Sequence, residues 1–172
     1  MPLIELTTII NAPIERCFDL ARSIDLHKLS TEGTDEEAIA GVTSGLIGKN
    51  GEVTWRAKHF GVVQHLSSRI TQYERPFLFR DEMIKGAFKS IKHDHIFREE
   101  GGATIMEDRM YFESPGWILG MLFNKLVLTN YLRKFLIRRN EMIKKVAEGE
   151  EWRKILNSNL PPTQTRRYVP DD

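Results

Sequence analysis

Apolar and polar residues alternate over residues 3–10, LIELTTII, near the start of the chain. Successive side chains of a strand point to opposite faces, so this alternation predicts a strand with one apolar side. Pro13 follows closely, and proline suits the first turn of a helix because its missing N–H would be unpaired there anyway. The next segment, IERCFDLARSIDLHKL, spaces its apolar residues as a helix does. We therefore expect a strand followed by one or two short helices.

Between about 35 and 112, runs typical of strands are separated by short turn sequences. These turn sequences are GKNG at 48–51, HFG near 60, YERP at 73–76, KG at 85–86 and EEGG at 99–102. Glycine, proline and asparagine are residues that tight turns favour, and short turns join antiparallel neighbours. The segment therefore predicts an antiparallel meander. The run at 62–70, VVQHLSSRI, does not indicate which side faces inward, so His65 stays unassigned.

Polar side chains fall on strand faces that are otherwise apolar. His93 and His95 share a face with Phe97, opposite Lys92, because strand side chains alternate. The same alternation groups further mixed faces: Trp55 and His59 with Val53 and Ala57, Phe79 and Asp81 with Phe77 and Met83, and Asp108 with Thr104, Met106, Met110 and Phe112. In a solid core every one of these polar groups would need a partner, whereas a cavity with water or ligand supplies one more easily. The mixed faces therefore indicate a cavity.

After Pro115 the pattern predicts a long helix over roughly 116–148. Polar residues interrupt its apolar run too often for a membrane span, so we expect this helix to lie on the sheet. Its basic residues are Lys125, Arg133, Lys134, Arg138, Arg139, Lys144 and Lys145. We interpret them as a solvated outer face. The alternative is contact with an anionic membrane, which would make the protein a peripheral membrane lipid carrier.

The chain has 172 residues and a formal net charge of +1, which suits one domain and gives no general attraction to nucleic acid. We expect a domain over 1–148 and a polar C-terminal extension over 149–172, where Pro161 and Pro162 occur. Cys17 is the only cysteine, so no disulfide can form within the chain, and we expect it in the core. The first residues alternate like a strand and do not resemble a signal peptide, so we expect a cytoplasmic protein.

The order of several segments along the chain resembles the START-like superfamily, also called SRPBCC, helix-grip or Bet v 1-like. Within it, the chain resembles the bacterial polyketide cyclase/dehydrase-like branch. The resemblance spans residues 1–148. The segments that carry it are NAPIERCFDL at 11–20, VTWRAKHFG at 53–61, HDHIF at 93–97, GGATIMEDRMYFESPGWILG at 101–120, and the helix that follows. Each motif is weak alone, and their order makes the resemblance specific.

The resemblance implies an α+β fold in which a seven-stranded, curved antiparallel sheet wraps around a long C-terminal helix, with two short helices after the first strand. It also implies a pocket between sheet and helix for a hydrophobic or amphipathic small molecule. Such proteins include lipid and hormone carriers as well as cyclases, so the resemblance implies no single activity.

We therefore expect a cytoplasmic protein that binds a small hydrophobic or amphipathic molecule, without nucleic acid, metal or cofactor. The candidate ligand-binding residues are Trp55, His59, Phe79, Asp81, His93, His95, Phe97, Met106, Asp108 and Met110. Apolar members would supply the walls, and polar members would orient the polar end of the ligand.

Two alternative functions, catalysis and metal binding, would use some of the same residues. His95 could act as an acid and base in a cyclase or dehydratase if Asp108 orients it across the EEGG turn. His93 and His95 could instead bind a metal with Asp108, Asp81 or His59 as third ligand. We do not expect the metal, since two histidines at this spacing are a weak signal and the sequence shows no compact ligand set around them.

Overall fold

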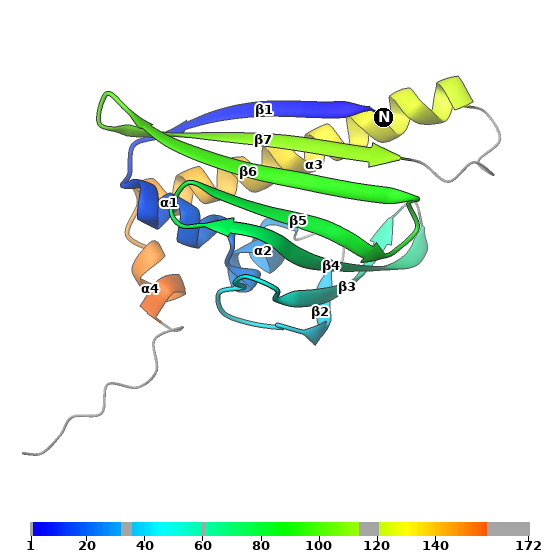
Figure 1. Cartoon of the computed structure of the whole chain (residues 1–172), viewed down its shortest axis with the longest axis horizontal. Coiled ribbons are helices and arrows are strands. Elements are labelled where there is room, and N and C mark those ends of the chain that lie inside the picture. Colours follow the sequence, from blue (N-terminus) through cyan, green and yellow to red (C-terminus); the bar gives the residue numbers. More distant parts are fainter. Residues whose placement is uncertain (1, 32–35, 60, 114–120, 158–172) are drawn as a thin grey trace, which may run out of the picture.

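The computed structural model describes residues 2–31, 36–59, 61–113 and 121–157, and the side chains of His59 and of residues 121–125 lie outside this description. Its elements follow the predicted order (Figure 1). They are β1 (Leu3–Ile10), α1 (Ile14–Ala21), α2 (Ile24–Ser30), β2 (Glu37–Gly41), β3 (Glu52–His59), β4 (Val62–Glu74), β5 (Leu78–Lys85), β6 (Ser90–Glu100), β7 (Ala103–Glu113), α3 (Met121–Glu148) and α4 (Trp152–Asn157).

The strands form one seven-stranded antiparallel sheet in the order β1-β7-β6-β5-β4-β3-β2. Strands β2 to β7 make a meander, and β1 joins its far edge by pairing with β7, as in Leu6 opposite Asp108. Gly101 and Gly102 both have positive φ in the β6–β7 turn, a conformation that glycine adopts without strain. The structure confirms the predicted α+β class, with a curved sheet, two short helices after the first strand and a long C-terminal helix.

Strand β4 explains why the run at 62–70 did not reveal its inner side. Gln64 and Ser68 point to the same side as the apolar Leu66 and Ile70. Polar residues on the inner side and the apolar Val63 on the outer side hide the alternation. The register with β5 also shifts between Ile70 and Gln72, and such a bulge bends the strand.

Helices α1 and α2 close one end of the sheet. Phe18 of α1 is fully buried and makes edge-to-face contacts with Phe79 and Phe97, at centroid distances of 5.3 and 5.4 Å. Cys17 is fully buried beside it, as predicted, and burial raises the pKa of its thiol. Ser23 begins α2 by accepting a hydrogen bond from the Leu26 N–H at 3.2 Å.

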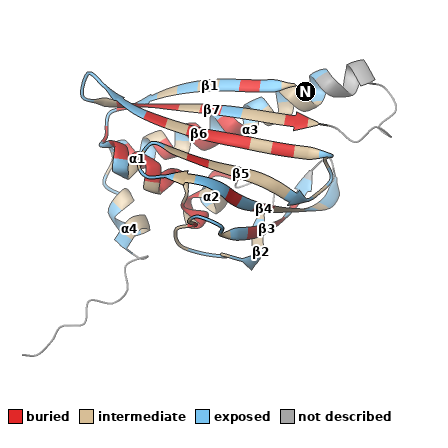
Figure 2. Cartoon of the chain, viewed as in Figure 1, coloured by how far each residue is buried: buried red, intermediate tan, exposed pale blue. Residues whose placement is uncertain are grey.

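The long helix α3 crosses the face of the sheet, and over residues 126–148, where burial is described, its buried residues lie in the C-terminal half of the helix (Figures 1 and 2). Leu136 packs with Ile4, Ile91 and Phe112 in one cluster, and Ile143 packs in the cluster that contains Phe18. Among the described residues, no helix has the length and hydropathy needed to cross a bilayer.

The predicted extension over 149–172 begins with a packed segment. Helix α4 follows α3 after a short break, and the Arg16 guanidinium of α1 lies 4.1 Å from the centre of the Trp152 ring. Trp152, Ile155 and Leu156 pack against the cluster around Phe18 although none of the three is buried.

Candidate functional site

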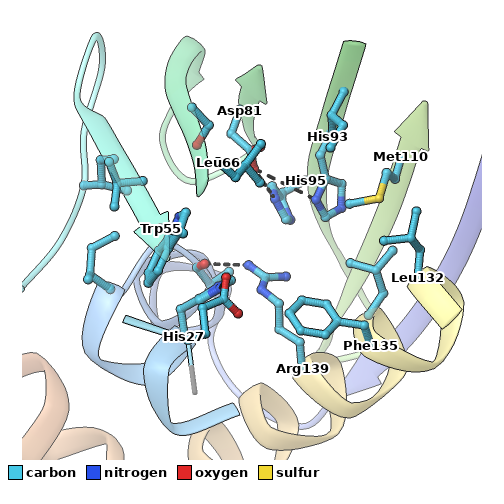
Figure 3. Close-up of a pocket in the computed structure, with 18 of the residues that line it drawn as sticks. His27, Trp55, Leu66, Asp81, His93, His95, Met110, Leu132, Phe135 and Arg139 are labelled. Carbon is cyan, nitrogen blue, oxygen red and sulfur yellow. Dashed lines mark hydrogen bonds and ion pairs between the residues drawn. The ribbon is translucent and has the colours of Figure 1, made fainter. Parts of the chain in front are cut away.

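A cavity of about 300 Å³ lies between the sheet, α2 and α3 (Figure 3). Its wall is mostly apolar and includes residues of both layers. The apolar residues are Ala21, Ile24, Ile47, Val53, Trp55, Leu66, Ile70, Phe79, Ala87, Phe88, Ile91, Met110, Leu128, Leu132, Phe135 and Leu136. Polar groups gather mainly at two places, one around His93 and His95 and one around His27 and Glu36.

The strand register brings two carboxylates to the two histidines. Asp81 of β5 lies opposite His93 of β6, and His95 lies opposite Asp108 of β7. All four residues point to the inner side because they occupy alternate positions on paired strands. Two of them, His93 and His95, are also nearest neighbours along that face, with ring centroids 3.8 Å apart.

Asp108 is the buried centre of this cluster and has no exposed surface. Its Oδ1 lies 2.9 Å from both His93 Nε2 and His95 Nδ1, and its Oδ2 accepts a hydrogen bond of 2.6 Å from the Asn140 amide. The His93 contact is aligned as a hydrogen bond, whereas His95 approaches at a poor angle. Burial alone would raise the pKa of Asp108, but the contacts with His93 and His95 outweigh it and hold that pKa well below its usual range.

Asp81 faces the same imidazoles from the cavity side. Its Oδ2 lies 3.4 Å from His95 Nε2 and 3.9 Å from His93 Nδ1. The side chain is 29% exposed, and this surface belongs to the cavity wall. Burial by the surrounding protein opposes ionisation, but His95 and His93 outweigh it and lower the pKa of Asp81. Each histidine therefore lies between two carboxylates.

His93 and His95 differ in their surroundings. Burial lowers the pKa of His93, the neighbouring His95 lowers it further, and Asp108 opposes both effects. The His95 ring stacks on Phe79 at a centroid distance of 4.2 Å and an interplanar angle of 21°. Phe79 therefore fixes the plane of His95, while Asp108 and Asp81 lie near its two nitrogens.

Arg139 of α3 completes the cluster from the helix side and points into the cavity (Figure 3). Its Nη2 donates a hydrogen bond of 2.7 Å to the Ala21 carbonyl, and its Nη1 lies 3.7 Å from Asp108 Oδ1. Burial lowers the pKa of Arg139, and Asp108 and Asp81 oppose that shift. The prediction that Arg139 belongs to a solvated outer face was wrong, because the residue is only 6% exposed.

The structure divides the predicted site residues into groups. Six of them line the cavity: Trp55, Phe79, Asp81, His93, His95 and Met110. Asp108 lies behind the imidazoles, and Phe97 and Met106 pack in the core around Phe18 and are not among the lining residues. His59 is the last residue of β3, and the prediction for its side chain falls outside the described residues.

Sequence reasoning missed Arg139, Asn140 and the pair His27 and Glu36. The signal for the first two was present in the helix pattern: they fall on the stripe formed by Leu132, Leu136, Ile143 and Ala147. A polar residue on an apolar helical stripe indicates a buried polar contact. The pair His27 and Glu36, with 3.5 Å between His27 Nε2 and Glu36 Oε1, links α2 to a residue just before β2 and left no such pattern.

No model of a protein family matches the chain, and no curated protein matches it as a relative. Solved structures do match. A START superfamily protein from Mycobacterium smegmatis has a TM-score of 0.63 at 11% identity, with 83% of this chain and 97% of that chain covered. The chain has the START fold.

Two further structures support this assignment. The protein TTHA0849 from Thermus thermophilus has a TM-score of 0.64 at 21% identity, covering 85% of this chain and 99% of that chain. The major latex-like protein 151 of Panax ginseng has a TM-score of 0.62 at 12% identity, covering 86% and 98%. At these identities the likeness is one of fold.

Proposed function

We propose that this START-fold protein binds a small amphipathic molecule in the cavity between the sheet and α3. The observation that carries the proposal is the cavity itself, which combines a mostly apolar wall with a few polar groups gathered mainly at two places. Ligand sites typically have about 300–1,000 Å³ and a few convergent polar groups. A volume of about 300 Å³ suits a small molecule rather than a long lipid chain.

The two parts of the wall would contribute differently to binding. Apolar side chains such as Trp55 and Leu132 would stabilise the complex by about 25 cal/mol per Å² of buried apolar surface, before the costs of association. Arg139 Nη1 has no hydrogen-bond partner among the described residues, and His95 and Asp81 face the same space. The polar end of the ligand is expected at these groups.

Native mass spectrometry of the protein purified from its own host tests the proposal. We expect a retained small molecule in the wild-type protein, and loss of that molecule from Leu132→Trp, which places an indole inside the cavity. Leu126→Trp is the matched control, because Leu126 lies on the same helix and is 64% exposed. The proposal is contradicted if all three proteins retain the same molecule, or if the wild type binds nothing from an extract of its host.

A second candidate function is proton transfer by His95, of the kind needed in a cyclase or dehydratase. The specific observation is that His95 lines the cavity, with Nδ1 beside Asp108 and Nε2 beside Asp81. His95→Gln separates the two functions. An enzyme would lose product formation from the recovered molecule while its affinity changes modestly; equal small changes in both quantities would eliminate the catalytic function.

The outer surface of α3 supports a further expectation about partners. Arg133, Lys134 and Arg138 are exposed, and so are Leu126 and Ile137. Basic side chains beside apolar ones suit a reversible contact with an anionic membrane. Such a contact would bring the cavity close to a source of amphipathic ligand.

A further inference from the structure

We propose that Asp81, His93 and His95 form a binding site for a divalent transition-metal ion of the Zn²⁺ or Fe²⁺ class. The three side chains each offer one ligand atom, and these atoms lie within 4.8 Å of one another. Imidazole suits zinc and iron, and two histidines with one carboxylate is a ligand set that both ions use. The site goes beyond the proposed ligand binding and shares Asp81 and His95 with it, but the apolar cavity that carries that proposal requires no ion. It departs from the expectation of no metal, because the pairing of β5 with β6 supplies the third ligand that the spacing of the two histidines alone did not.

The distances between the ligand atoms are close to those that an ion requires. Metal–ligand bonds of about 2.0–2.2 Å in a tetrahedral site place the ligand atoms roughly 3.4 Å apart. Asp81 Oδ2 already lies 3.4 Å from His95 Nε2 and 3.9 Å from His93 Nδ1. All three ligand atoms lie within 4.8 Å of one another, so binding an ion requires side-chain rotations that shorten the longer distances, and Asp81 is 29% exposed to the cavity.

Asp108 lies behind both imidazoles and is hydrogen-bonded to that of His93. It lies 2.9 Å from His93 Nε2 and from His95 Nδ1, which leaves His93 Nδ1 and His95 Nε2 directed toward Asp81. Metal-binding histidines commonly donate their other ring N–H to a carboxylate, which fixes the tautomer and makes the ligand nitrogen more basic. Asn140 in turn holds Asp108 with a hydrogen bond of 2.6 Å.

The charge and the openness of the cluster also suit a cation. The carboxylates Asp81 and Asp108 outweigh the single guanidinium of Arg139, which lies 3.7 Å from Asp108 on the helix side. Three protein ligands leave at least one coordination position free. That position would face the cavity, because Asp81, His93 and His95 all line it.

Titration of the metal-free full-length chain with Co²⁺ tests the site, because the visible absorption of Co²⁺ intensifies when protein ligands replace water in a low-symmetry site. We expect saturation at one ion per chain and competition by Zn²⁺. Asp81→Asn and His95→Gln should each weaken Co²⁺ binding by at least about 100-fold, and Asp108→Asn by about 10–100-fold. His65→Gln, at an exposed histidine of β4, is the control and should bind as the wild type does.

A thermal-unfolding measurement with Zn²⁺ guards against variants that fold poorly. Zn²⁺ should raise the Tm of the wild type and of His65→Gln, and it should raise that of Asp81→Asn by much less, because the stabilisation depends on the affinity for the ion. The proposal is overturned if Co²⁺ gives no intensified absorption with the folded wild type, or if wild type and Asp81→Asn bind it equally. Neither outcome would affect the proposed binding of an amphipathic molecule.

Discussion

Asp108 is fully buried and yet keeps its negative charge, because donors surround it. His93 donates to one carboxylate oxygen and Asn140 to the other, while Arg139 lies 3.7 Å away. Such a carboxylate stabilises the fold only while its partners are present. The same contacts hold His93 and His95 in place at the cavity wall, so stability and site geometry depend on one side chain.

Asp108→Asn should lower the free energy of unfolding by about 3–5 kcal/mol at pH 7, because it leaves the buried Arg139 guanidinium without its nearest charge partner. Urea denaturation measures this change. Glu107→Gln is the matched control on the opposite face of β7, where the partly exposed pair with Arg98 should contribute at most about 1 kcal/mol. Equal losses in both variants would contradict the central position of Asp108.

The stability of the protein in acid should also depend on Asp108. The pKa of Asp108 in the folded protein lies well below the usual 3.8. The contribution of Asp108 to the free energy of unfolding is therefore complete above about pH 3.8, and it is lost as the pH falls through the folded pKa. The unfolded chain takes up the proton first, which favours unfolding. Asp108→Asn should therefore have a smaller loss of stability below about pH 4 than the wild type.

His93 predicts a second pH dependence, in a higher range. Burial lowers its pKa below the usual 6.5, so between that value and the folded pKa the unfolded state binds more protons than the folded state. Stability should therefore fall as the pH falls below about 6.5. His93→Gln should flatten this decline in urea denaturation measured at a series of pH values, whereas His65→Gln should not. An unchanged slope in His93→Gln would rule out a neutral buried His93.

For individual residues, the sequence predicted which side chains point inward but not which residues they contact. Two-residue alternation correctly grouped His93, His95 and Asp108 on the inner side of the sheet. It could not separate Phe97, which packs on Phe18, from Phe79, which also reaches the cavity. That difference depends on where α1 ends and α3 begins to cover the sheet, and strand periodicity contains no information about it.

Among the elements, α3 supplies the wall of the cavity that faces the sheet, and Arg139 is its charged member. Its stripe of Leu132, Leu136 and Ile143 places Arg139 toward the sheet, while Arg133, Lys134 and Arg138 point outward. A count of basic residues treats all of these alike, and this is why Arg139 was assigned to the outer face. The helical period of 3.6 residues distinguishes them, since Arg139 lies one turn from both Leu136 and Ile143.

The outward basic residues of α3 predict salt-sensitive binding to anionic vesicles. Binding measured by vesicle co-sedimentation should weaken as the salt concentration rises, because exposed charges are screened. Charge reversal at Arg133, Lys134 and Arg138 should reduce it by at least about tenfold, given about 1 kcal/mol for each basic residue near the surface.

The matched control for these changes reverses three exposed lysines on other elements, Lys58, Lys85 and Lys154. It should retain most of the vesicle binding although its net charge changes equally. If both triple variants lose binding equally, the attraction depends on total charge and not on α3. If the wild type binds no vesicles at low salt, the expected membrane contact is wrong.

For the whole molecule, the order of elements was readable because each depends on local signals. Turn residues marked the ends of β3 to β7, and the change from two-residue to helical spacing marked α3. The cavity depends instead on contacts between distant segments, such as Arg139 with the Ala21 carbonyl. The mixed apolar and polar faces indicated a cavity, while its size and its missed residues follow from how α2 and α3 pack on the sheet.

The most direct test of the proposed binding cavity is a fluorescence titration with anilinonaphthalene sulfonate, an amphipathic anion that brightens in apolar surroundings. We expect one saturable site in the wild type, affinity within about twofold in Leu126→Trp, and a loss of at least about tenfold in Leu132→Trp, equivalent to about 1.4 kcal/mol. Equal binding to Leu132→Trp and Leu126→Trp would show that the probe occupies another surface, and it would contradict the assignment of ligand binding to this cavity.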